Sequence, residues 1–179
     1  MGCTYDIFNA RFKNEKYKKD FMDLWNSVLK DDLYDNWAHA SEKNFSIDEV
    51  TGEVVFAIDS EPLFTMMYNG EQLEPFLVEF LKKHPDIELH ADYECTFNNC
   101  GDMVLKFYEY YGDNILKIKT YQSDAPYICE CEECGYEDDG EDLFTMHDLV
   151  NGTEMKCPNC GAEFEIDAYI EEEKINIFR

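Results

Sequence analysis

Two short segments near the end of the chain hold cysteines in the same arrangement, which limits its possible folds more than any other feature. The pairs are Cys131 with Cys134 and Cys157 with Cys160, and a glycine directly follows each pair. Glycine adopts the left-handed backbone conformation at little cost, so each segment is typical of a tight turn that directs two sulfurs to one point. Because 22 residues separate the pairs, the sequence predicts two turns that share one four-thiol site.

Four thiolates around one point are a common ligand set for Zn²⁺, so we expect one structural zinc in an acidic zinc-ribbon domain over residues 127–179. Protein ligands fill every coordination position, which leaves no place for a catalytic water. Cys129 could replace Cys131 as a ligand, and His147 could replace one cysteine. The thiols could also be reduced and unliganded. A disulfide framework is disfavoured because the N-terminus shows no secretory pattern.

The first part of the chain alternates between strand and helix patterns. Aromatic and β-branched residues over 4–12 predict a strand, and apolar residues from Tyr17 to Val28 recur with the spacing of one helix face. A second strand is expected to begin near Glu53 and to form a hairpin with the segment before it. Apolar residues from Leu73 to Leu81 predict a second helix.

Three further strands follow the second helix pattern. Residues 87–95 alternate strictly between apolar and charged side chains, and segments 103–111 and 115–123 are separated from each other by a glycine-containing turn. This order predicts an α+β fold, a ferredoxin-like two-layer sandwich with a mostly antiparallel sheet and two helices. We expect that domain to span residues 1–123, with a linker at 124–126 before the zinc ribbon.

Several short motifs in this domain resemble the YubB ferredoxin-like family. They are Lys83-His84-Pro85-Asp86 at the end of the second helix, Tyr93-Glu94, Cys100-Gly101 and Gly112-Asp113. The resemblance covers residues 1–121. It implies the ferredoxin-like fold and an origin in phages, plasmids or other mobile elements, where members of this family are found.

Acidic residues outnumber basic residues by 40 to 15, which gives a formal net charge of −25. Residues 1–45 contribute −1 (7 basic, 8 acidic), whereas residues 121–179 contribute −14 (3 basic, 17 acidic). Nucleic acids and anionic membranes repel such a surface, so we expect neither to bind directly. No apolar run reaches the ~18 residues of a membrane helix, so a cytoplasmic location is expected. The charge could also serve solubility alone.

The acidic residues around the first cysteine pair are the predicted partner-binding residues. They are Glu130, Glu132, Glu133, Glu137, Asp138, Asp139, Glu141 and Asp142. Their charge predicts a partner protein with a basic, nucleic-acid-binding surface. With the mobile-element resemblance, this favours an inhibitor of a defence nuclease, an anti-CRISPR or anti-restriction factor acting by DNA mimicry. The alternative is a zinc-ribbon accessory factor that docks on transcription or replication machinery. No catalytic constellation is evident, so no enzyme is expected, and the oligomeric state is left open.

Overall fold

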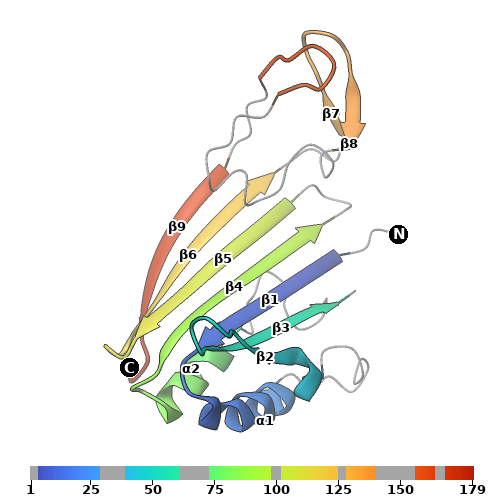
Figure 1. The fold of residues 1–179 in the computed structure, drawn as a ribbon. Coiled ribbons are helices and arrows are strands. Elements are labelled where there is room, and N and C mark those ends of the chain that lie inside the picture. Colours follow the sequence, from blue (N-terminus) through green and yellow to red (C-terminus); the bar gives the residue numbers. More distant parts are fainter. Residues whose placement is uncertain are drawn as a thin grey trace.

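Seven antiparallel strands form one sheet, and two helices pack on one of its faces (Figure 1). The strand order is β2-β3-β1-β4-β5-β6-β9. A computed structural model describes residues 4–28, 39–60, 73–97, 102–124, 128–139, 156–163 and 168–179. The strands of the large sheet are β1 (Thr4–Phe12), β2 (Phe45–Ile47), β3 (Val54–Ser60), β4 (Glu88–Phe97), β5 (Asp102–Tyr111), β6 (Ile115–Asp124) and β9 (Ala168–Asn176). The α-helices are α1 (Lys18–Val28) and α2 (Leu73–Lys83).

The helical periodicities seen in the sequence are confirmed, because the apolar stripe of each helix is buried. Helix α1 follows a short 3-10 turn at Glu15–Tyr17 and buries Phe21 and Trp25 completely. Helix α2 buries five residues: Leu73, Phe76, Leu77, Phe80 and Leu81. The ring of Phe21 lies 5.0 Å from each of the Phe76 and Phe80 rings, at nearly right angles. Edge-to-face contacts of this kind join the two helices in one aromatic core.

The strands show the expected alternation between a buried and a polar face. In β1, Phe8, Ala10 and Phe12 are fully buried against the helices, whereas Arg11 is exposed on the opposite face. The predicted hairpin is confirmed as β2 and β3, which are joined by a turn. The predicted meander is confirmed as β4, β5 and β6.

A polar contact fixes the start of helix α2 against strand β5. The Glu74 carboxylate accepts hydrogen bonds from Lys106 Nζ and the Tyr108 hydroxyl, each at 2.9 Å. The Lys106 and Glu74 side chains are 15% and 17% exposed. Burial, followed by the charge of Glu74, raises the pKa of Tyr108, so this phenol stays protonated as a donor. The carboxylate, the ammonium group and the phenol therefore have hydrogen-bond partners within this contact, which indicates a structural role.

Strand β9 makes the sheet larger than the sequence predicted. It pairs with β6 from Ile115↔Asn176 to Ser123↔Ala168, although its residues fall in the range expected for the zinc ribbon. Ile177, just after β9, is fully buried in the main core. The last residues of the chain therefore belong to the same sheet as β6. The division into domains at 123 and 127 remains a prediction.

Candidate metal centre

The first cysteine pair lies between two short strands, β7 (Ile128–Glu130) and β8 (Glu137–Asp139), which pair antiparallel in a separate sheet. The Cys131 N–H donates to the Tyr136 carbonyl at 2.8 Å, and the Gly135 N–H donates to the Cys131 carbonyl at 2.7 Å. Gly135 has a φ of 68°, the left-handed conformation that favours glycine. These two bonds close the turn around Cys134.

The second pair repeats this turn bond for bond. The Cys157 N–H donates to the Ala162 carbonyl at 2.7 Å, and the Gly161 N–H donates to the Cys157 carbonyl at 2.8 Å. Gly161 has a φ of 78°. A β-bridge between Lys156 and Glu163 closes the base of the turn. The glycine that follows each pair in the sequence is therefore explained by one local geometry used twice.

The two turns bring Cys131, Cys134, Cys157 and Cys160 together. Their four sulfurs lie within 4.8 Å of one another, a cluster that could hold a metal ion. The Cys131–Cys160 and Cys134–Cys157 sulfur pairs are 3.6 and 3.7 Å apart. A tetrahedral zinc with bonds of ~2.3 Å would place sulfurs ~3.8 Å apart, whereas a disulfide needs ~2.05 Å. The spacing fits a shared metal ion and excludes disulfides within these two pairs.

The four thiols differ in environment. Cys131 and Cys157 are 3% and 2% exposed, whereas Cys134 and Cys160 lie on the surface. The Asn159 side-chain amide, 3.4 Å from the Cys134 sulfur, and the Tyr136 backbone lower the pKa of Cys134 to about 7. At Cys160 the backbone of Ala162 lowers the pKa, but burial and the neighbouring thiols raise it to about 12 overall.

The difference between the pKa values of Cys134 and Cys160 indicates whether a metal ion suits the site. One thiolate forms readily in the cluster, and its charge then opposes ionisation of its neighbours. Four thiolates at neutral pH therefore require a compensating cation at the centre. A bound dication would supply that charge, and the exposed Cys134 and Cys160 give it a path from solvent. The donor set, its spacing and its electrostatics all suit a structural, four-coordinate ion.

The predicted partner-binding residues are only partly placed by the structure. Glu132, Glu133 and Glu137 are exposed around the first turn. Glu130 is the last residue of β7, and Asp138 and Asp139 belong to β8. Cys129 in β7 is the register partner of Asp138 in β8. Glu141, Asp142 and His147 fall outside the described residues.

One functional side chain was missed from the sequence. Asn159 lies between the cysteines of the second pair, yet its amide donates to a sulfur of the first pair. An N–H group that donates to a ligand sulfur orients and stabilises the thiolate. The sequence does place an asparagine between two cysteines, and an amide in a metal-binding turn can reach a neighbouring sulfur. Its target could not be known before the two turns were placed together.

Strands β7 and β8, which flank the first cysteine turn, lie beyond the end of the large sheet that is farthest from the helices (Figure 1). In sequence, both turns fall between β6 and β9, which pair directly with each other. The cysteine turns are thus carried on a long connection between two adjacent strands of the main sheet.

Comparison with known proteins identifies no relative. No protein-family model, curated protein or solved structure matches the chain. Within the described part of the chain, no helix is long and apolar enough to cross a membrane.

Proposed function

We propose that this chain is an acidic, zinc-binding interaction protein that inhibits a nucleic-acid-binding partner, such as a defence nuclease, by occupying its basic groove. The observation that carries the proposal is the four-cysteine cluster, which holds a carboxylate-rich turn at one end of the molecule. The metal serves to fix the shape of that end, and the carboxylates make the contacts.

Zinc is the proposed ion because its preferences match the donors. Tetrahedral thiolate sites select zinc or iron, and paired Cys-x-x-Cys-Gly turns with every position filled are typical of structural zinc. Strands β7 and β8 have only three residues each, so the metal would supply the free energy that holds them in place.

The fold of the first part supports a ferredoxin-like origin. The order of elements is β1-α1-β2-β3-α2-β4, and these four strands lie in the order β2-β3-β1-β4. This order is the one expected of a split βαβ, ferredoxin-like arrangement, and we propose that the domain is such a fold extended by β5, β6 and β9. We propose that the mobile-element context implied by the YubB-like motifs applies to this protein.

Charge supports the choice of partner. The thirty-one residues 121–151 hold ten acidic groups and no basic group, and Glu132, Glu133 and Glu137 are exposed. Four thiolates around one dication would add a further charge of about −2. Such a surface is attracted to clusters of Lys and Arg and associates quickly in a salt-sensitive manner. Carboxylates would then stand where the phosphates of a nucleic acid lie.

The test neutralises the exposed carboxylates around the first cysteine turn and leaves the four cysteines unchanged. Glu132→Gln, Glu133→Gln and Glu137→Gln are combined in one variant, and zinc content is measured to show that the turns persist. Tagged wild-type and variant proteins are then used to capture partners from a bacterial lysate at low and high salt. We expect wild-type protein to retain a nucleic-acid-binding protein at low salt, and the variant to bind that protein more weakly.

Surface plasmon resonance on the captured partner decides the mechanism. A slower association rate and a flatter salt dependence in the variant would support charge mimicry. A partner bound equally well by both proteins would instead favour the accessory factor that docks without mimicry. Direct binding of duplex DNA by the wild-type protein at physiological salt would contradict the proposal.

A further inference from the structure

The face of the sheet opposite the helices carries a groove over strands β5, β6 and β9. It has a volume of about 290 Å³, near the lower end of the range for small-ligand sites. Three lysines (Lys117, Lys119 and Lys174) and three carboxylates (Glu109, Glu172 and Glu173) line this groove. Phe107, which is partly exposed, also lines the groove. Lysine is therefore concentrated here in a chain that is otherwise strongly acidic.

Two of these lysines lie directly opposite each other. Lys117 on β6 and Lys174 on β9 are register partners, and like charges in this position destabilise a sheet. Among the described residues neither forms an ion pair, although Lys117 Nζ lies over the Tyr111 ring at 5.1 Å and Glu109 is its register partner on β5. Lys119 differs, since its Nζ lies 3.8 Å from the Glu172 carboxylate. The register places the two lysines on the same face of neighbouring strands, where their flexible side chains can both reach one anion.

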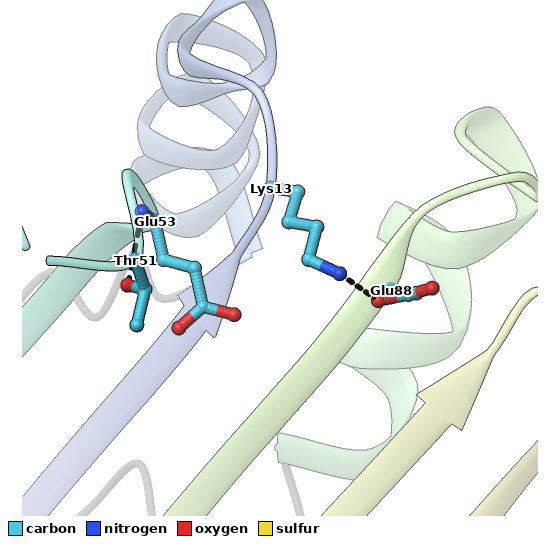
Figure 2. A network of polar contacts seen from close by, with 4 residues as sticks. All are labelled: Lys13, Thr51, Glu53 and Glu88. Carbon is cyan, nitrogen blue, oxygen red and sulfur yellow. Dashed lines mark hydrogen bonds and ion pairs between the residues drawn. The ribbon is translucent and has the colours of Figure 1, made fainter.

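A lysine elsewhere on the molecule shows a contrasting arrangement. Lys13, just after β1, reaches the Glu88 carboxylate on the neighbouring strand, with Glu53 nearby (Figure 2). The hydrogen bond and charge of Glu88 raise the pKa of Lys13, and Glu53 adds to the effect. With acidic residues so abundant, a partner of this kind is readily available. Lys174, by contrast, has a lysine as its register partner on β6.

The groove also offers an apolar surface beside the two cations. Phe107 faces Lys119 across β5 and β6, and its ring packs edge-on against the Tyr121 ring at 6.0 Å. One part of its surface remains open to the groove. Aromatic faces of this kind bind planar ring systems by stacking. The flanking Glu109 and Glu172 carboxylates are acceptors for N–H groups.

We propose that this groove binds a free mononucleotide. The phosphate lies between Lys117 and Lys174, the base stacks against Phe107, and the amino group of the base donates to Glu172 or Glu109. This ligand combines the three properties that the groove provides for: a compact anion, a planar ring and N–H donors.

A single-stranded nucleic acid has the same groups but suits this molecule poorly. A polymer extends beyond the groove onto a surface whose net charge is strongly negative, and each further phosphate adds repulsion. A mononucleotide keeps its charge within the reach of the two lysines, because salt screens charges beyond about 8–10 Å. The site therefore favours the small ligand over the polymer.

Isothermal titration calorimetry of the full-length, metal-loaded protein tests the proposal, with AMP, adenosine, inorganic phosphate and a single-stranded oligonucleotide as probes. We expect AMP to bind more tightly than adenosine or phosphate alone. Lys174→Gln and Lys117→Gln should each weaken AMP binding by about tenfold or more, as for loss of a charge-assisted contact. Phe107→Leu should weaken AMP binding and leave phosphate binding unchanged.

Lys13→Gln is the matched control, because it removes one surface charge outside the groove and should leave AMP binding unchanged. Circular dichroism of each variant confirms that the sheet is retained. Absence of AMP binding to wild-type protein at concentrations of about 10 mM would overturn the proposal. So would equal AMP binding by wild-type and Lys174→Gln proteins, or an oligonucleotide that binds more tightly than AMP. None of these results depends on the proposed partner protein.

Discussion

At the scale of single residues, the metal centre depends on four side chains with unequal environments. Cys131 and Cys157 are buried and Cys134 and Cys160 are exposed, so the ion would be held by two inner and two outer sulfurs. Loss of any one sulfur leaves three ligands and an unbalanced cluster. Metal content should therefore respond to each ligand substitution, whereas other cysteines should have no effect.

Purified protein should contain about one zinc per chain, and Cys134→Ser or Cys160→Ser should remove it. Cys129→Ser is the matched control, because it removes a thiol two residues before Cys131 and should retain the metal. Elemental analysis by mass spectrometry measures all of these proteins. Loss of zinc in Cys129→Ser, with zinc retained in Cys131→Ser, would show that the ligand is Cys129.

At the residue scale, the burial of His84 should also make the stability of the protein depend on pH. Its ring lies 4.5 Å from the Tyr17 ring and 5.0 Å from the Phe80 ring, and its side chain is 13% exposed. Burial lowers the pKa of His84 below its ordinary value of 6.5, although Asp20, whose Oδ2 is 3.2 Å from Nε2, acts in the opposite direction. The folded protein therefore takes up this proton less readily than the unfolded chain does.

The free energy of unfolding should consequently fall as the pH decreases below about 6.5, because protonation then favours the unfolded chain. The loss should reach its limit once the pH passes below the lowered pKa of the folded protein. Urea denaturation at a series of pH values between 7 and about 5 measures this. The difference between wild-type and His84→Gln proteins isolates this contribution from that of the carboxylates. An identical pH dependence of the two proteins would contradict the assignment.

At the scale of elements, strand β9 connects the segment that carries the cysteine turns to the main core. Its partner β6 lies before the cysteine turns in the chain, and the buried Ile177 follows β9 directly. A chain that ends before the cysteine turns would therefore lack part of the sheet. We expect such a truncated chain to unfold at lower urea concentration than the full-length protein.

Ile177→Ala should destabilise the protein by about 2–5 kcal/mol, the usual cost of truncating a fully buried isoleucine. Ile170→Ala changes the same side chain within β9, where it is 61% exposed, and should cost less than about 0.5 kcal/mol. Chemical denaturation of both variants gives the comparison. Similar costs for the two would show that β9 is not integrated into the core in the way described here.

At the scale of the whole molecule, a net charge of −25 opposes compaction. Ion pairs on the described surface, such as Lys13 with Glu88, are exposed and contribute little stability. Repulsion among the remaining carboxylates acts over the whole surface and is screened by dissolved salt. The balance between these effects predicts how the stability depends on ionic strength.

The melting temperature should rise by several degrees as the NaCl concentration increases, because screening relieves repulsion more than it weakens the exposed ion pairs. Differential scanning calorimetry at low and high salt, with zinc present in both, measures this. A melting temperature that falls with added salt would show that specific ion pairs outweigh the net charge.

The local elements and the metal cluster could be read from the sequence, because each depends on residues close together in the chain. The spacing of Phe21 and Trp25 predicts a buried helix face, and two Cys-x-x-Cys-Gly segments predict two turns with convergent sulfurs. Both patterns depend only on the backbone geometry of a few consecutive residues. Residue spacing was therefore sufficient to predict them.

Only the tertiary structure decided how distant segments pair. It placed β1 between β3 and β4, added β9 to the sheet and directed the Asn159 amide to Cys134. It also set Lys117 opposite Lys174, which no local pattern indicates. The physical reason is that strand register is fixed by hydrogen bonds and packing between segments far apart in the chain. Periodicity within a strand tells which face is apolar, but not which strand lies beside it.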